Sequence, residues 1–149
     1  MIRFLERPMI VLQSAAGEAE EAIRESGRLL ERAGAVRPSY TEAMVEAYRR
    51  LGPYFVVAPH IALPHARPED GVVQAAVSLV QLREPVRFGH AANDPVRLVF
   101  GIAAASSPQH IELVRRLSAL LADETRQKQL MEVKDVESVH RWIREGSAP

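Results

Sequence analysis

The run from Val96 to Ala104 places the strongest constraint on the fold of this chain, because Arg97 is its only charged residue. A strand that is apolar on both faces has to be covered on both sides. We therefore predict a central strand between two layers of helices. The longest uncharged stretch, Leu98–Ala105, has eight residues, far fewer than the roughly 20 that a helix needs to cross a bilayer, so no membrane insertion is expected.

Apolar residues at helical spacing predict helices before and after the strands. We expect Gly34 to close the first helix, and Ser39 with Glu42 to form a capping box at the start of the second. Ser107 is the expected cap of a third helix, with Pro108 at its first position. The order of helices, then strands, then helices predicts an α/β fold: a three-layer α/β/α sandwich with a mixed central sheet of about five strands flanked by helices. The expected helices are residues 18–33, 39–51, a segment from 107, 124–131 and 135–144, and the expected strands are 54–57, 77–82 and 96–104.

Length and composition indicate one domain, residues 1–149, in which only residues 146–149 are expected to fray. Nineteen Lys and Arg residues balance 19 Asp and Glu residues, so we expect no nucleic-acid partner. The chain has no cysteine, which excludes disulfides, thiolate nucleophiles and zinc sites built on cysteine. The N-terminus carries charge where a signal peptide is apolar, and we expect a cytoplasmic location.

Titratable chemistry near neutral pH therefore falls to five histidines, and His65 is the first candidate. It lies in the segment Ala58–Pro68, which contains three prolines and two histidines. Proline restricts the backbone, so the segment is a stiff connection that could hold a reactive side chain in one orientation. His65 is then either a nucleophile or base, or a turn residue that caps a backbone group.

His110 is the second candidate, because it falls in the first turn of the helix that follows the apolar strand. The end of a strand followed by a helix N-terminus is where open α/β sheets bind ligands, and backbone N–H groups there favour phosphate. The positive end of the helix dipole also favours a neutral imidazole. The alternative is an exposed histidine with no chemical role.

A histidine metal site is a weaker hypothesis, since His60, His65, His90 and His110 match no compact ligand motif. We expect no metal and no cofactor. Arg49, Arg50 and Arg67 could bind an anion or could be solvated surface groups. His140, in the last expected helix, is interpreted as surface or as support for that helix.

Several segments together resemble one family. They are Gly52–Glu69, which contains Leu63-Pro64-His65, then Glu84–His90, Asn93–Val96, and His110 at the start of the next helix. This combination resembles the enzyme IIA component of the bacterial sugar phosphotransferase system, mannitol/fructose type (type 2), and within it the ascorbate-like branch. The resemblance covers most of the chain.

The resemblance implies a phosphoryl relay. The phosphohistidine carrier protein HPr would donate to His65, and His65 would pass the group to a cysteine of a IIB component. His110 corresponds to the second active-site histidine and would stabilise the phosphate. An active-site arginine of mannitol-type members corresponds to Arg49 or to the adjacent Arg50. His60 stands where similar proteins commonly have glycine, so it is a candidate third imidazole.

The same resemblance implies uptake of a sugar or sugar acid such as ascorbate, with specificity set by a membrane IIC permease that the chain reaches only indirectly. A homo-oligomer is compatible with the sequence. Two other functions are carried forward. One is a regulatory module whose phosphorylation state is read by a partner protein, and the other is a metal-dependent hydrolase that uses the histidine cluster.

Overall fold

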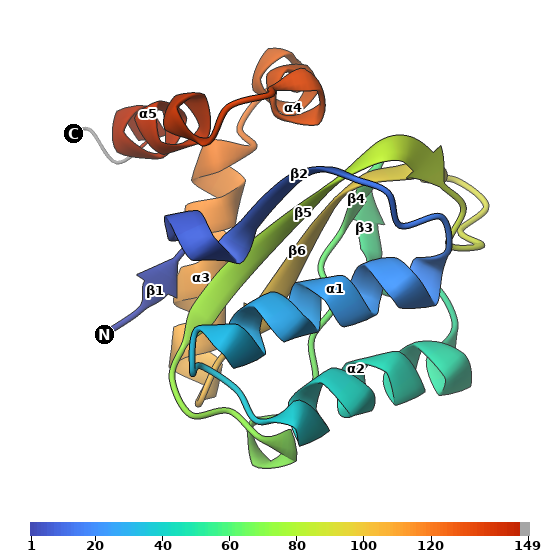
Figure 1. The fold of residues 1–149 in the computed structure, drawn as a ribbon, viewed down its shortest axis with the longest axis vertical. Coiled ribbons are helices and arrows are strands. Elements are labelled where there is room, and N and C mark those ends of the chain that lie inside the picture. The colour runs from blue at the N-terminus through green and yellow to red at the C-terminus, as the bar shows by residue number, and fades with distance from the viewer. Residues whose placement is uncertain (147–149) are drawn as a thin grey trace.

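A mixed six-stranded sheet forms the centre of the protein (Figure 1). The structure is a computed structural model and describes residues 1–146. The strands follow the order β1-β5-β6-β4-β3, and β2 also pairs with β5. β5 and β6 are antiparallel, whereas β1 and β2 run parallel to β5 and β4 runs parallel to β6. The strands are β1 (Arg3–Phe4), β2 (Ile10–Ser14), β3 (Val56–Ala58), β4 (Ile61–Ala62), β5 (Ala76–Val86) and β6 (Val96–Ala103).

Helices cover both faces of the sheet, as predicted. In Figure 1, α1 and α2 lie on one side and α3 on the other, with α4 and α5 beyond one end of the sheet. None of the helices among residues 1–146 combines the length and the apolar character needed to span a bilayer. The helices are α1 (Ala19–Arg32), α2 (Pro38–Leu51), α3 (Ser107–Leu120), α4 (Glu124–Glu132) and α5 (Val136–Gly146), and two short 3₁₀ helices are η1 (Arg7–Met9) and η2 (Pro68–Asp70).

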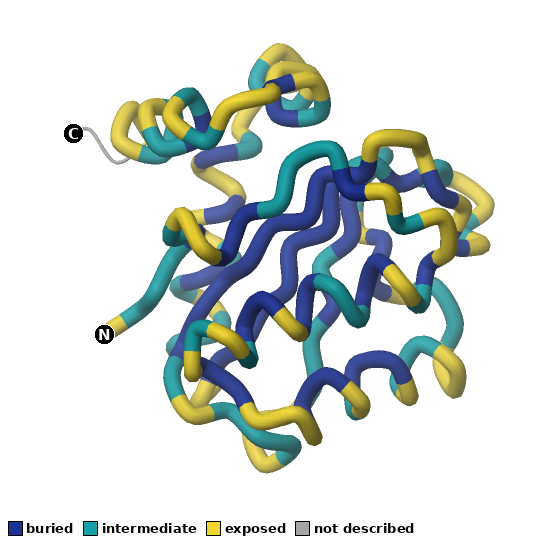
Figure 2. Tube along the Cα trace, in the orientation of Figure 1, coloured by how far each residue is buried: buried dark blue, intermediate teal, exposed yellow. Residues whose placement is uncertain are grey.

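The predicted central strand is confirmed in β6, which is buried along almost its whole length (Figure 2). Its side chains alternate between two cores. Val99 and Ala103 pack with α1 and α2 in one core, whereas Leu98, Phe100 and Ile102 pack with α3 in the other. The three-layer sandwich therefore follows directly from an apolar run that must be covered twice.

The predicted order of elements is wrong at the N-terminus, because two strands, β1 and β2, precede the first helix. β1 has only two residues, and β2 is interrupted by an irregular register against β5. Such short segments carry too little alternation to be read from the sequence. The expected strand at 54–57 is also displaced: Val56 N–H donates to the Pro53 carbonyl, so Tyr54 and Phe55 form a turn before β3.

Two predicted helix caps are also corrected. α2 begins at Pro38, and Ser39 Oγ donates to the Asp70 carbonyl instead of capping the helix. In α3 the cap is Ser106, whose hydroxyl accepts the Gln109 N–H. The prediction for Gly34 is confirmed, since this residue has φ +77° and closes α1. α5 extends to Gly146, and the expectation of fraying at 147–149 lies outside the described residues.

Candidate functional site

His65 lies in the connection between β4 and η2, on the stiff segment that the prolines predict. Its ring is half-buried, and Nδ1 lies 2.9 Å from the Leu63 carbonyl oxygen. A carbonyl can only accept, so Nδ1 carries the proton and donates it. Nε2 is therefore the unprotonated nitrogen of the neutral ring and holds the lone pair.

The backbone around His65 is bound on both sides. Leu63 N–H donates to the Phe55 carbonyl at 2.9 Å, and the Pro64 carbonyl accepts the Ile102 N–H at 3.0 Å. After His65, Ala66 N–H donates to the Tyr40 hydroxyl at 3.0 Å. These bonds connect the segment to the turn before β3, to β6 and to α2, so the position of His65 is set by three parts of the fold.

His110 lies in the first turn of α3, as predicted, and beside His65, as the family resemblance implies. The two ring centroids are 5.4 Å apart, with an angle of 55° between the planes. Burial lowers the pKa of His110 below its usual 6.5, and the nearby His65 lowers it further. The neutral imidazole is therefore favoured. The helix dipole was predicted to favour this same neutral form, and desolvation is the larger cause in the structure.

An apolar groove of about 450 Å³ opens beside the two histidines on the α3 side. We call it the His110 groove. Its walls come from β3, from β4 and the segment after it, from β6 and from α3, and it continues towards Gln127 on α4. Besides His65 and His110, its lining includes Val57, Ile61, Leu63, Ile102, Val114 and Leu117.

A second groove of about 430 Å³ meets His65 from the α2 side, and we call it the Arg50 groove. Arg50 lines it together with Tyr54 and Arg67. Tyr54 approaches the His65 ring edge-on, with 6.0 Å between centroids. Arg67 is bound to Asp70, whereas the Arg50 side chain makes no hydrogen bond or ion pair within the described residues 1–146. An unpaired guanidinium is thus present next to the candidate nucleophile.

The structure separates the two adjacent arginines. Arg49 points to α1, where its Nε and Nη2 donate to the Glu20 carboxylate at 3.0 and 2.7 Å. It lines neither groove, so of the two candidates only Arg50 lies beside His65. Successive residues on a helix point about 100° apart, so the two adjacent side chains face different parts of the fold.

The other histidines do not join the site. His60 has φ +70°, a conformation that glycine adopts most easily, and its Nδ1 binds the Pro95 carbonyl at 2.7 Å. His90 accepts the N–H groups of Ala92 and Asn93 in a loop. His140 Nε2 donates to the Leu5 carbonyl, which agrees with its interpretation as helix support. Within residues 1–146 no group of three or more acidic or histidine side chains could hold a metal ion.

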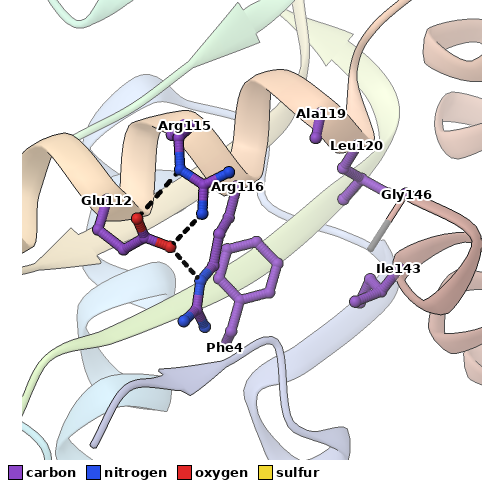
Figure 3. A pocket seen from close by; sticks show the side chains of 8 residues that line it. All are labelled: Phe4, Glu112, Arg115, Arg116, Ala119, Leu120, Ile143 and Gly146. Atoms are coloured by element: carbon purple, nitrogen blue, oxygen red, sulfur yellow. Dashed lines mark hydrogen bonds and ion pairs between the residues drawn. The ribbon is translucent and has the colours of Figure 1, made fainter. Parts of the chain in front are cut away.

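A third cavity, of about 590 Å³, lies between α3, β1 and the end of α5 (Figure 3). Glu112 in its wall accepts hydrogen bonds from Arg115 at 2.6 and 3.0 Å and from Arg116 at 2.9 Å. These two guanidinium groups lower the pKa of Glu112 to about 2. The charges are thus already matched to each other, and no histidine lines the cavity.

Two supporting residues were missed by the sequence analysis. Tyr54 falls in the expected strand 54–57 and Tyr40 in the expected helix 39–51, and neither was predicted to support the site. Burial raises the pKa of Tyr40 to about 12, so its hydroxyl stays protonated at neutral pH and remains a donor. A tyrosine in an apolar stripe was the signal available, because a buried hydroxyl needs a partner.

Comparison with known proteins gives consistent results. The family model described as phosphoenolpyruvate-dependent sugar phosphotransferase system, EIIA 2, matches residues 3–146. The ascorbate-specific PTS system EIIA component of Salmonella choleraesuis is 39% identical over 120 residues, which cover 80% of this chain and 78% of that protein.

Solved structures agree with this match. The crystal structure of a putative PTS IIA from Streptococcus mutans is 36% identical, with a TM-score of 0.86 over 95% of this chain and 90% of that chain. The IIA of the Escherichia coli mannitol system, solved in complex with phosphorylated IIB, is 33% identical, with a TM-score of 0.85 over 97% and 99% of the respective chains.

Proposed function

This chain belongs to the EIIA 2 family of the phosphoenolpyruvate-dependent sugar phosphotransferase system, and on that premise we propose that it carries the phosphoryl group on His65. The observation that carries the proposal is the bond from His65 Nδ1 to the Leu63 carbonyl, 2.9 Å long. It fixes the tautomer in which Nε2 holds a lone pair. A neutral imidazole nitrogen of this kind can attack phosphorus without a separate base.

The proposed reaction has two transfers. In the first, His65 Nε2 attacks the phosphorus of the phosphohistidine on HPr, so that the donor P–N bond breaks as the new P–Nε2 bond forms. In the second, a cysteine thiolate of a IIB component attacks the same phosphorus, and the P–Nε2 bond breaks. Both transfers depend mainly on in-line positioning and on stabilisation of charge on the phosphoryl oxygens.

We assign the charge stabilisation to His110 and Arg50. His110 is neutral before transfer, because burial lowers its pKa. A dianionic phosphoryl group on His65, 5.4 Å away between ring centroids, would raise that pKa and draw a proton onto His110. Arg50 supplies a permanent positive charge from the Arg50 groove, on the α2 side of His65. The phosphoryl group would then be held from both sides.

The surface around His65 is suited to transient protein partners. Its exposed large apolar side chains are Leu51, Tyr54, Val57 and Ile111, between 42% and 67% exposed. Each lines one of the two grooves or directly follows His110. We infer that HPr and a IIB component bind this surface in turn. The mannitol IIA that resembles this chain was solved with phosphorylated IIB, which supports the inference.

We infer the cellular setting from the same relatives. The names of the ascorbate-specific relatives support a sugar acid of the ascorbate type as the transported substrate. A membrane IIC permease would be reached only through IIB, and the protein would work in the cytoplasm as one domain spanning residues 1–149. The family match over residues 3–146 supports that span.

Intact-mass analysis tests the proposal. The protein is incubated with phosphoenolpyruvate, enzyme I and HPr, and we expect an acid-labile gain of about 80 Da, one phosphoryl group. The gain should be absent in His65→Ala and retained in His90→Ala, whose histidine lies in a separate loop. Arg50→Ala should slow uptake, whereas Arg49→Ala should not. No gain in the wild type with its cognate carrier, or a gain that persists in His65→Ala, would overturn the proposal.

Adding the cognate IIB separates transport from regulation. In a transport relay the phosphoryl group leaves His65 and appears on the IIB cysteine. A protein that stays phosphorylated in the presence of that IIB would instead favour the regulatory module.

A further inference from the structure

Tyr40 occupies an unusual position for a core tyrosine. It lies in the first turn of α2 and is fully buried, yet its hydroxyl contacts the backbone of two other parts of the fold. The hydroxyl donates to the Ile102 carbonyl at 2.6 Å and accepts the Ala66 N–H at 3.0 Å. One oxygen atom therefore links α2, the end of β6 and the residue that follows His65.

These bonds enclose His65 between two connections to the same residue. On one side, the Pro64 carbonyl accepts the Ile102 N–H directly at 3.0 Å. On the other side, the Ala66 N–H reaches the Ile102 carbonyl through the Tyr40 hydroxyl. Both peptide units that flank His65 are thereby fixed to one point of the sheet. The Leu63 carbonyl, which binds His65 Nδ1, belongs to the same short segment.

Two of the three elements that Tyr40 connects carry groups of the proposed phosphate site, and the third, β6, leads into the helix that carries the last group. Arg50 lies on α2, His65 on the segment after β4, and His110 on the helix that follows β6. The hydroxyl is uncharged and buried, so screening by salt does not weaken its hydrogen bonds. Without it, the Ala66 N–H would lose its partner, and the segment could rotate about His65.

We propose that Tyr40 is a positioning residue for phosphoryl transfer: its hydroxyl holds His65 in the orientation and tautomer that receive the phosphoryl group. It thereby keeps His65 aligned with Arg50 and His110. This inference rests on the proposed function of His65. It assigns to Tyr40 no contact with the phosphoryl group or with a partner protein.

A second tyrosine on the same helix provides a matched control. The Tyr48 hydroxyl donates to the Phe88 carbonyl at 2.6 Å, and neither residue lines a groove that contains His65. Tyr40→Phe and Tyr48→Phe therefore remove the same atom from α2, and each variant loses one short bond to a carbonyl. Only Tyr40→Phe also frees a backbone N–H next to His65.

The test compares phosphoryl uptake from HPr and the nitrogen spectrum of the His65 ring. We expect Tyr40→Phe to lower the maximal rate about 10- to 100-fold, the range that small displacements of a reacting group produce, with an unchanged KM for HPr. The ¹⁵N shifts of His65 should change from a single Nδ1–H tautomer to a mixture. Tyr48→Phe should alter neither quantity. A maximal rate within twofold of wild type, or equal losses in both variants, would overturn the inference.

Failure of this inference differs from failure of the proposed function. A wild type that takes up no phosphoryl group refutes the function of His65, whereas the tautomer comparison still decides what Tyr40 does to the ring. If Tyr40→Phe does not fold, hydrogen exchange on the wild type decides. The Ala66 amide should exchange far more slowly than that of the exposed Glu69, and equally fast exchange would overturn the inference.

Discussion

Replacing Gln81 by leucine should weaken the attachment of α4 to the sheet. Gln81 lies on β5 and is fully buried. Its Nε2 donates to the carbonyls of Leu130 and Val133, each at 2.8 Å, and its Oε1 accepts the Gln13 N–H at 2.9 Å. Leucine keeps the approximate size of the side chain but leaves these three backbone groups without their partner.

The expected cost follows from those three bonds. Each contributes about 1 kcal/mol net, so Gln81→Leu should lower the free energy of unfolding by about 3 kcal/mol. For a chain of this length that corresponds to a fall in Tm of roughly 6 to 12 °C. Such a loss is a large part of the total stability of an ordinary domain, which is about 5 to 15 kcal/mol.

Urea unfolding followed by circular dichroism measures this change. The midpoint should fall while the m value stays constant, because the area exposed on unfolding is nearly the same. Gln129→Leu is the control, since Gln129 is exposed on α4, and it should change stability by less than about 0.5 kcal/mol. A loss below about 1 kcal/mol in Gln81→Leu would refute the reasoning, because it would mean that the three backbone groups find other partners or water.

Three further predictions concern packing and charge. Gly101→Ala should lower the free energy of unfolding by about 1 to 3 kcal/mol, measured with urea, because a Cβ atom there would lie 2.7 Å from Ser78 Oγ. Gly17→Ala is the control, since a Cβ atom at that position meets no atom within 4 Å. Equal losses in the two variants would contradict the prediction. Because burial lowers the pKa of His110, its contribution to stability is complete above the unfolded pKa of about 6.5 and is lost as pH falls towards the folded value. His110→Gln should thus reduce the loss of stability on acidification below that pH, and an unchanged pH profile would disprove this. The Glu112 carboxylate should titrate near pH 2 by ¹³C NMR and near its ordinary value after both Arg115→Gln and Arg116→Gln, and a normal titration in the wild type would speak against these ion pairs.

The central strand and the helical layers were predictable because burial on two faces leaves a strong signal in the sequence. β6 shows this, with Val99 in one core and Phe100 in the other. β1, by contrast, has two residues, and its pairing with Ala76 and Val77 depends on contacts more than 70 positions away. No local pattern encodes such a partner.

The candidate site, too, was predictable only in part. The prolines around His65 and the helix start near His110 indicated where each side chain would be mounted. Their approach to 5.4 Å, across 45 positions of sequence, follows from the pairing of β4 with β6. The choice between Arg49 and Arg50 required the packing of α1 against α2, because Glu20 binds the first of the two. Sequence alone could not supply that contact.

The edge of the sheet beside His65 affects how long a partner protein stays bound there. The edge strand there is β3, which has only three residues and is followed at once by Pro59, a residue without the N–H that a paired strand must donate. A visiting protein cannot extend the sheet by adding a strand of its own along this border, a mode of binding in which a whole row of main-chain bonds must break before release. Recognition falls to side chains instead, and complexes held in that way can have short residence times. A carrier that must leave one protein before it can serve the next works fastest with such brief encounters.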